Sequence, residues 1–327
     1  MRHGNISVFV PHIGCPNKCS FCNQNTITGE KISPKKEDVV NAVETAASHP
    51  AYDPENTELA FFGGSFTAIE KEYMCELLDV GCSYVKNGTV SGIRISTRPD
   101  AITPEILDIL KQKGVTAIEL GCQSLDNEVL RLNHRGHTAE DVKKASHLIK
   151  QYGFSLGLQM MTGLLGDTNE KAILTAEKIV ELGADTVRIY PTLLLKDTYL
   201  YSLYQKGEYL PQTVEQAVEL VSELLILFEK ADIKVIRVGL HTVEVDGFVQ
   251  GPWHPAFGEL AKSRVLFKKV LKIINDKNIP KGNIEIRLPK PKISAMIGQK
   301  RGNIKALKEL GYNAIITEGE KFSVLNL

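Results

Sequence analysis

The chain has 327 residues, of which 43% are hydrophobic and 24% charged, and its formal net charge is zero. This is enough apolar sequence to bury a full-sized core, either as one barrel or as a barrel with a small appendage. The chain has no run of about 18 apolar residues that would span a bilayer and no apolar signal segment near its start, so we expect a cytoplasmic protein without membrane contacts.

Short apolar runs typical of β-strands alternate with amphipathic segments typical of helices. The predicted strands are Ile6–Pro11, Glu58–Phe62, Gly92–Ser96, Ala117–Gly121, Ser155–Met161 and Thr186–Tyr190. The predicted helices are Lys35–Ala47, Ala68–Val85, Pro104–Lys113 with Thr103 as its cap, Ala139–Tyr152 and Asn169–Leu182. Repeated strand–helix units favour parallel strands with right-handed crossovers, and a closed barrel would need eight. We therefore predict an α/β fold with a partial (β/α)6 TIM barrel.

A second, smaller unit is predicted after the barrel. An amphipathic helix over Val214–Lys230 and a short strand over Val235–Val238 follow the sixth strand. A segment rich in glycine, proline and aromatic residues then leads into a helix over Glu259–Asp276. We predict a barrel domain over residues 1–250 and a C-terminal α+β region over residues 251–327.

Three cysteines that follow the first predicted strand carry the clearest chemical signal. Cys15, Cys19 and Cys22 lie within eight residues, whereas the other three cysteines are scattered, which does not indicate a disulfide framework. Thiolates at short spacing suit an iron–sulfur cluster or zinc. Zinc would require a fourth ligand, for which His12 stands close in sequence. Three thiolates suit a cluster with one iron left open to another ligand.

With Phe21 before its last cysteine, this CxxxCxxC motif resembles the signature of the radical S-adenosylmethionine (SAM) superfamily. The resemblance implies that Cys15, Cys19 and Cys22 hold a [4Fe–4S] cluster whose open iron chelates the amino and carboxylate groups of SAM. It further implies reductive cleavage of SAM to a 5′-deoxyadenosyl radical and a flavodoxin- or ferredoxin-like protein as reductant. In such enzymes the protein positions the reactants, and the cofactor supplies the chemistry.

Glycine and polar residues follow the second and third predicted strands, where a barrel places its active site. Gly63 and Gly64 allow the backbone to approach a ligand closely, although a tight turn alone would use them in the same way. The segment resembles the family's Gly-Gly-Glu motif, which implies contacts with the SAM amino group, and Ser65 replaces its acid. Arg98 either faces the same cavity or pairs with Asp100.

Later strand ends resemble the Elongator catalytic subunit and oxygen-independent coproporphyrinogen oxidase. That resemblance implies that Gln123 contacts the SAM ribose and that Arg135, whose fork suits a carboxylate, binds the SAM carboxylate. Gln159 stands where the coproporphyrinogen enzyme carries a ribose-binding acid. Tyr190 is a candidate for the same pocket or for simple packing.

The stretch Val187–Gly207 resembles the Elongator catalytic subunit specifically, and this similarity extends over about residues 5–265. Elongator-type enzymes use a downstream acetyltransferase-like domain to bind acetyl-CoA. The sequence from Gly258 to Leu327 is too short for such a domain, so we do not expect the same acetyl-CoA reaction.

The C-terminal region is basic, with 15 Lys and Arg against 6 Asp and Glu from Gly258 onward. Such an excess indicates a polyanion contact or, equally, a solvated basic face. A loop at Gly298–Gly302 is surrounded by a helix ending at Leu310 and by the predicted strands Ile284–Pro289, Ala314–Thr317 and Phe322–Leu325. This arrangement resembles a KH module, which binds a nucleic-acid backbone at a glycine loop. A KH loop has two residues between its glycines, whereas this loop has three. The alternative is a small α/β cap. The candidate RNA-binding residues are Lys290, Lys292, Lys300, Arg301 and Lys305.

Three functions are compatible with these features. The first is a radical SAM enzyme that modifies RNA, either tRNA or ribosomal RNA. The second is a radical SAM enzyme of small-molecule metabolism that resembles coproporphyrinogen dehydrogenase. The third is a non-catalytic iron–sulfur or zinc protein that binds nucleic acid.

Overall fold

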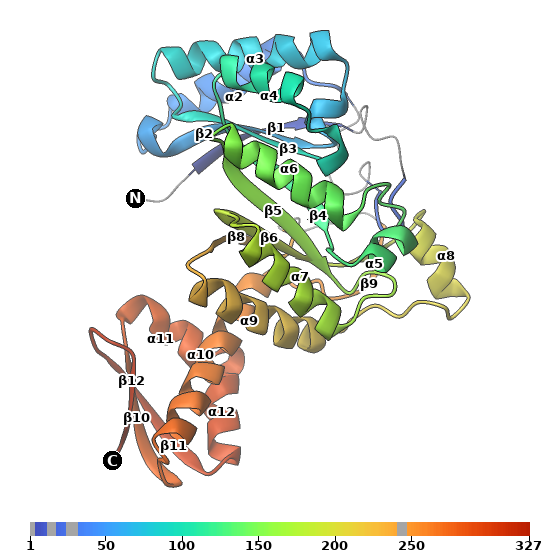
Figure 1. Cartoon of the computed structure of the whole chain (residues 1–327). Coiled ribbons are helices and arrows are strands. Elements are labelled where there is room, and N and C mark those ends of the chain that lie inside the picture. Colours follow the sequence, from blue (N-terminus) through green and yellow to red (C-terminus); the bar gives the residue numbers. More distant parts are fainter. Residues whose placement is uncertain (1–3, 12–17, 24–31, 241–246) are drawn as a thin grey trace.

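A curled, parallel seven-stranded sheet forms the larger part of the molecule (Figure 1). The computed structural model describes residues 4–11, 18–23, 32–240 and 247–327. In sheet order the strands are β1 (Gly4–Val10), β2 (Thr57–Gly63), β3 (Gly92–Thr97), β4 (Val115–Gln123), β5 (Ser155–Thr162), β6 (Thr186–Pro191) and β8 (Lys234–Val238). The predicted α/β partial barrel is confirmed. The strand predicted over Val235–Val238 was not counted among the six units of the barrel, but as β8 it pairs with β6 and adds a seventh parallel strand.

Helices cover the outer face of this sheet (Figure 1). The main ones are α2 (Lys36–Ala47), α3 (Lys71–Lys86), α4 (Pro104–Gln112), α6 (Ala139–Gln151), α7 (Asn169–Glu181) and α9 (Val214–Lys230). Capping boxes at Thr138 and Thr213 begin α6 and α9. Two short helices, α5 (Asn127–Leu132) and α8 (Tyr199–Gln205), were not predicted, because six or seven residues are too few to show a helical period. Over the described residues, no helix is long and apolar enough to cross a bilayer.

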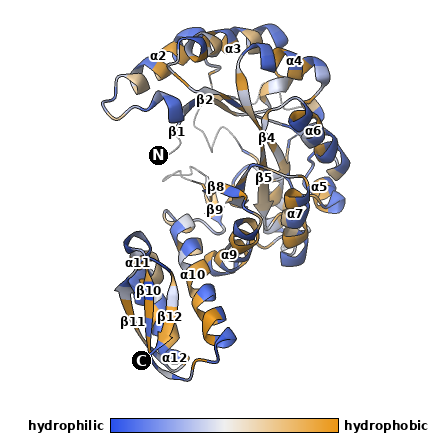
Figure 2. Cartoon of the chain, turned by 60° about the vertical axis from the view of Figure 1, so that its left-hand side comes forward, coloured by the Kyte–Doolittle hydropathy of each residue, from blue (hydrophilic) through white to orange (hydrophobic). Residues whose placement is uncertain are grey.

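The two faces of the sheet differ in polarity. Residues that point outward, such as Phe61, Ile95 and Ile118, are fully buried against the helices, and Figure 2 shows these apolar strands and helix faces. The alternate residues point inward, because successive side chains along a strand face opposite sides. On β4 these inward positions include Glu119 and Gln123. The curled sheet therefore has an apolar outer layer and a polar interior.

The C-terminal region forms a separate small layer of helices on a three-stranded sheet (Figure 1). Its elements are α10 (Phe257–Asp276), β10 (Gly282–Leu288), α11 (Lys290–Ile297), α12 (Gly302–Glu309), β11 (Tyr312–Glu318) and β12 (Ser323–Asn326). Strand β10 is central, parallel to β11 and antiparallel to β12. Helix α11 was not predicted, because Pro291 interrupts its sequence; a proline is tolerated there because it lies in the first turn.

Helix α10 connects the two parts through packing and charge. Phe257 and Ala261 belong to the barrel core, whereas Leu266 and Phe267 belong to the appendage core. The basic side chains of α10 also pair with acids of α9: Arg264 lies 2.6 Å from Glu219, Lys268 2.7 Å from Glu219, and Lys269 2.6 Å from Glu229. One helix is thus shared by both cores, and the division predicted at residue 250 stays a prediction.

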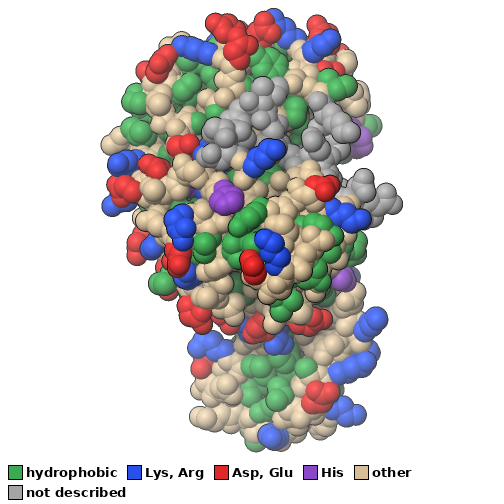
Figure 3. Space-filling view, turned by 90° about the vertical axis from the view of Figure 1, so that its right-hand side faces the viewer, with side chains coloured by type: hydrophobic (Ala, Val, Ile, Leu, Met, Phe, Trp, Pro, Cys, Tyr) green, Lys and Arg blue, Asp and Glu red, His purple; other side chains and the backbone are tan. Residues whose placement is uncertain are grey.

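Figure 3 shows the surface of the molecule from the right-hand side of Figure 1. On this side, Lys and Arg side chains gather along one edge of the appendage. A short antiparallel pair of strands, β7 (Leu194–Leu195) and β9 (Phe248–Gln250), follows β6 and precedes α10.

Candidate active site

A cavity of about 130 Å³ lies where the central strands of the barrel end. Its lining residues are Cys19, Phe21, Cys22, Gly63, Gly64, Ser65, Ser96, Thr97, Arg98, Gly121, Gln123, Arg135 and Gln159. The structure thus brings together all the described candidates for the cluster and for SAM except Tyr190. Cys15 lies outside the described residues. Thr97 and Gly121 were missed, although their positions just before Arg98 and Gln123 were an available signal.

Gly63 brings two strands of the cavity wall unusually close. Its φ is +118°, and a Cβ atom at this position would lie 2.4 Å from the carbonyl oxygen of Val10. The backbone N–H of Gly64 donates to that same oxygen at 2.9 Å. A side chain at residue 63 would therefore push apart β2 and the end of β1, from which the cysteine segment departs.

Gln123 ends β4 in a conformation that is rare for a residue with a side chain. Its φ is +63°, and the pairing of β4 with β5 shifts register between Leu120 and Gln123. The side-chain Oε1 is buried and has no hydrogen-bond partner in the described part of the chain. A strained residue with an unpaired buried acceptor is typical of a ligand site.

Arg135 reaches the cavity from the connection between α5 and α6. Its Nη1 donates to Cys19 Sγ at 3.0 Å and its Nη2 to the carbonyl oxygen of Gly121 at 2.7 Å. Its Nε is buried and unpartnered among the described residues. Arg98, for which two roles were predicted, both lines the cavity and pairs with Asp100 at 2.7 Å.

Below the cavity lies a network of buried charges. Glu119 is 1% exposed and accepts from Arg188 Nε at 2.5 Å, Arg188 Nη2 at 2.9 Å and Arg94 Nη1 at 3.3 Å. Arg94 also donates to Glu58 at 2.7 Å. Burial alone would lower the pKa of Arg188, but hydrogen bonding to Glu119 and its charge raise it overall. Two acids and two arginines thus neutralise one another inside the barrel.

This network fixes one of the cavity residues. Gln159 Nε2 donates to Glu119 Oε2 at 3.1 Å, so its amide is oriented by a carboxylate that can only accept. Tyr190, which does not line the cavity, interacts by hydrogen bonding with Arg188 instead. Tyr190 therefore belongs to the charged layer below the predicted SAM pocket.

Two further ionisable side chains, His137 and Cys122, are buried next to the cavity residues Arg135 and Gln123. Burial, and then the charge of Arg135, lower the pKa of His137 to about 4. Burial raises the pKa of the Cys122 thiol to about 12, and its Sγ donates to the carbonyl oxygen of Gln159 at 2.8 Å. At neutral pH His137 is uncharged and Cys122 remains a thiol, so neither adds a charge to the site.

The pKa of His137 gives a test by pH. An unfolded histidine has a pKa near 6.5, so as the pH falls from 7 to 4 the unfolded chain binds a proton that the folded chain does not bind. We expect the free energy of unfolding of the wild type to fall by about 3 kcal/mol over this range relative to that of His137→Gln. Urea unfolding of both proteins at several pH values measures this difference. Parallel pH profiles would contradict the burial of a neutral His137.

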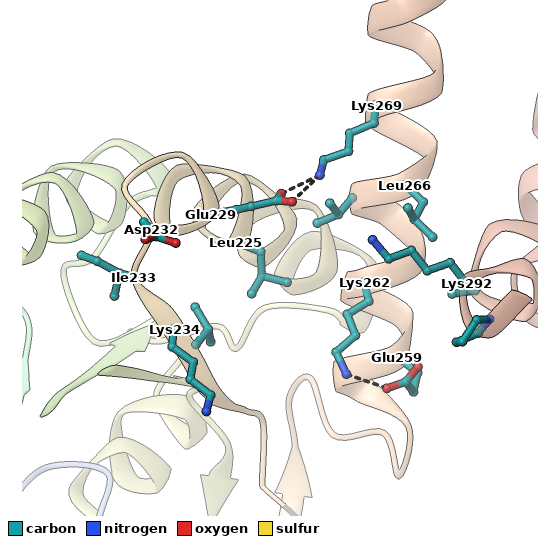
Figure 4. Close-up of a pocket in the computed structure, with 14 residues that line it drawn as sticks. Leu225, Glu229, Asp232, Ile233, Lys234, Glu259, Lys262, Leu266, Lys269 and Lys292 are labelled. Atoms are coloured by element: carbon teal, nitrogen blue, oxygen red, sulfur yellow. Dashed lines mark hydrogen bonds and ion pairs between the residues drawn. The ribbon is translucent and has the colours of Figure 1, made fainter. Parts of the chain in front are cut away.

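A larger groove lies elsewhere, at the end of the barrel where the strands begin (Figure 4). It has a volume of about 710 Å³ and lies between α9, β8, α10 and α11. Two of its lysines pair with acids that also line it, Lys269 with Glu229 and Lys262 with Glu259. Because these charges satisfy one another, they do not converge on a ligand.

Two of the three predicted cluster ligands lie in the described part of the chain. Within them, no group of three or more His, Cys, Asp or Glu is arranged to hold a metal ion. Cys19 and Cys22 lie on the same cavity, and the Cys22 backbone N–H donates to the Cys19 carbonyl oxygen at 3.1 Å.

Comparisons with known proteins agree with this geometry. Residues 9–179 match the model of the radical SAM superfamily, and residues 184–266 match a radical SAM C-terminal domain. The chain is 32% identical over 198 residues to a tRNA uridine(34) acetyltransferase of Methanocaldococcus infernus, which covers 53% of this chain and 36% of that protein. It is 31% identical over 193 residues to human Elongator complex protein 3, which covers 53% and 35%, respectively.

A solved structure of archaeal Elp3 from Methanocaldococcus infernus shares the fold, with a TM-score of 0.67 at 24% identity, over 90% of this chain and 70% of that one. The chain spans 34% to 52% of the length of the three tRNA uridine(34) acetyltransferases that it matches. The superfamily model alone matches more than half of the chain. The chain therefore belongs to the radical SAM superfamily and is a radical SAM enzyme whose cofactors are a [4Fe–4S] cluster and SAM.

Proposed function

We propose that this enzyme modifies tRNA and that the cavity at the strand ends holds its cluster and SAM. The observation that carries the RNA substrate is the similarity to tRNA uridine(34) acetyltransferases and to Elongator complex protein 3 across the barrel. The basic appendage adds independent support. Because the chain spans only part of the tRNA uridine(34) acetyltransferases, the proposed function does not include acetyl transfer.

The residues of the cavity fit both cofactors. Cys19 and Cys22 supply thiolates for the cluster, with Cys15 as the third ligand. Gln123 Oε1, which is buried and unpaired within the described chain, is an acceptor suited to a ribose hydroxyl. Arg135 Nε is a buried donor suited to a carboxylate. Gly63 and Gly64 line this cavity with backbone atoms alone, and a side chain at residue 63 would clash with the carbonyl oxygen of Val10.

When bound, the reduced cluster supplies the electron that cleaves SAM and starts radical chemistry. The chain's own residues hold and shield the reactants. Phe21 lines the cavity with an apolar ring, and the carboxylate of Glu119 holds the amide of Gln159 in place. Arg188 stays fixed below by Glu119 and by stacking over the Phe62 ring at 4.9 Å.

Support for an RNA contact comes from the cations of the appendage. The basic side chains of α10 are largely paired with acids of α9. By contrast, the five candidates are exposed and form no ion pair within the described residues: Lys290, Lys292, Lys300, Arg301 and Lys305. Exposed unpaired cations neutralise phosphates without first breaking another contact.

The five candidates lie at two different ends of the appendage. Lys292 lines the large groove at the end where the barrel strands begin (Figure 4). Lys300 and Arg301 belong to the loop between α11 and α12, where their φ values are +50° and +61°. Gly298 and Gly302 of this loop line a second groove, of about 530 Å³, beside the first turn of α9.

Helices that follow the barrel strands begin at the end where the strands stop. The loop Gly298–Gly302, which lies beside the start of α9, therefore lies toward the open end of the barrel, while Lys292 lies toward the opposite end. An RNA that reaches the cavity should pass this loop. The position between two helices, α11 and α12, is also the one that the resemblance to a KH module implies.

Reversing the two loop charges tests this surface. We expect Lys300→Glu together with Arg301→Glu to lower tRNA affinity at least tenfold and to reduce the slope of log affinity against log salt by about two, since each phosphate contact contributes about one. Binding is measured by fluorescence anisotropy at several salt concentrations. Lys290→Glu with Lys292→Glu makes the same charge change at the other end of the appendage and is expected to lower the affinity less, because Lys292 lies away from the open end of the barrel.

Unchanged affinity after loop reversal, or a wild type without salt-dependent binding, would contradict an RNA contact at this loop. Comparison of modified nucleosides in total RNA with and without the gene then tests the substrate class. A nucleoside that disappears with the gene identifies the substrate, and an identical nucleoside profile would contradict RNA modification.

A further inference from the structure

The segment that carries Cys19 is held by the connection that follows α5. The backbone N–H of Ser20 donates to the carbonyl oxygen of Asn133 at 3.1 Å, and Ser20 Oγ donates to Asn133 Oδ1 at 2.6 Å. Both residues are fully buried. Two residues further on, Arg135 Nη1 donates to Cys19 Sγ at 3.0 Å. The cysteine segment and the segment Asn133–Arg135 therefore form one interlocked unit.

The guanidinium of Arg135 is held by contacts within the protein. Its Nη2 donates to the carbonyl oxygen of Gly121 at 2.7 Å, and its own carbonyl oxygen accepts from Arg98 Nη2 at 2.9 Å. Arg98 is held in turn by two contacts with Asp100, at 2.7 and 3.0 Å. Arg135 is 8% exposed, so little water competes for its donors. A rigid, buried cationic donor of this kind can stabilise negative charge on the sulfur to which it donates.

We propose that Arg135 is a positioning residue for the cluster, which it serves by donating a hydrogen bond to the sulfur of Cys19. One-electron reduction makes a [4Fe–4S] cluster more negative, so a cationic donor at a ligand sulfur stabilises the reduced form and raises the reduction potential. This role differs from binding the SAM carboxylate, because Nη1 and Nη2 are already engaged with Cys19 and Gly121. It rests on the placement of the cluster at Cys19 proposed above, and it does not depend on the RNA substrate.

The reduction potential of the cluster-loaded, SAM-free protein tests this role. Redox titration with dithionite, followed by electron paramagnetic resonance, gives the midpoint potential of the wild type, Arg135→Gln and Arg135→Lys. We expect R135Q to lower the ratio of reduced to oxidised cluster at a fixed potential about tenfold, which corresponds to about 59 mV for one electron. R135K keeps the cation and should shift the potential less.

Arg131→Gln is the matched control, because Arg131 is an exposed arginine of α5 and its loss removes the same charge from the same part of the chain. Its potential should equal that of the wild type. If R135Q folds but loads less iron than R131Q, the contact is also supported, since partners of metal ligands strengthen metal binding. If R135Q does not fold, R135K carries the test.

Equal iron content and an equal potential in R135Q and the wild type would overturn the proposal. Arg135 would then act on SAM alone, which SAM affinity would show. None of these measurements uses RNA, so they remain valid if the RNA role fails. A wild type that loads no cluster would instead contradict the placement of the cluster in this cavity.

Discussion

Replacing Cys19 by alanine is expected to abolish the iron–sulfur cluster and the SAM cleavage that depends on it. Cys19 and Cys22 lie on the cavity beside the predicted SAM residues, and a three-thiolate site that loses one ligand cannot hold a cubane with a single open iron. The protein is purified without air and reconstituted with iron and sulfide. Iron and sulfide content and the dithionite-dependent formation of 5′-deoxyadenosine from SAM are then measured.

Cys75→Ala provides the control for this experiment. Cys75 is a half-buried residue of α3, remote in sequence from the cluster motif, so its loss should leave the iron content and the formation of 5′-deoxyadenosine unchanged. A Cys19→Ala protein that retains an intact cluster would contradict the ligand assignment. Wild-type protein that binds zinc alone, or that cleaves no SAM with a full cluster, would point to the non-catalytic alternative.

Glu119→Gln is expected to destabilise the folded protein by about 3–5 kcal/mol. The variant keeps the shape of the side chain but leaves Arg94 and Arg188 with one buried negative charge fewer, and an uncompensated buried charge carries a cost of this size. The midpoint of urea unfolding, followed by circular dichroism, should fall accordingly. The glutamine keeps only one acceptor oxygen for Gln159, Arg94 and Arg188, so the amide of Gln159 should be held less firmly and SAM should bind more weakly.

Glu105→Gln is the matched control for the buried charge. Glu105 pairs with Lys71 at 2.6 Å, but both side chains are exposed, so its loss should leave the free energy of unfolding nearly unchanged. Equal stability of E119Q and E105Q would show that the charges inside the barrel do not depend on Glu119 for their neutralisation.

Much of the fold follows from local sequence patterns. The six strand–helix units and the helix Val214–Lys230 were predicted with small differences at their ends, because alternation and helical periodicity act over short segments. The seventh strand was recognised as a strand, but its pairing with β6 depends on the curvature of the whole sheet. Short α5 and α8 and the proline-containing α11 do not have enough residues to show a period.

The convergence of the candidate site was also predictable, because parallel strands bring their carboxyl ends to one edge. Gly63, Gln123 and Gln159 meet there as expected. The contact of Arg135 with Cys19 was not predictable, since it joins residues 116 positions apart through the path of a connection. Tyr190 shares the inward face of β6 with Arg188, and only the structure shows that it lies in the charged layer. Which residues bind the cofactors stays a prediction.

Helix α10 sets a geometric constraint on how a large substrate could be presented. Its 20 residues span about 30 Å, and it contributes side chains to both hydrophobic cores. The appendage cannot swing away without exposing apolar surface and separating the ion pairs with α9. A polymer bound to the appendage would therefore enter the cavity at a fixed distance from its binding site. The nucleotide that reaches the cavity would then depend on the three-dimensional shape of the polymer as much as on its local sequence.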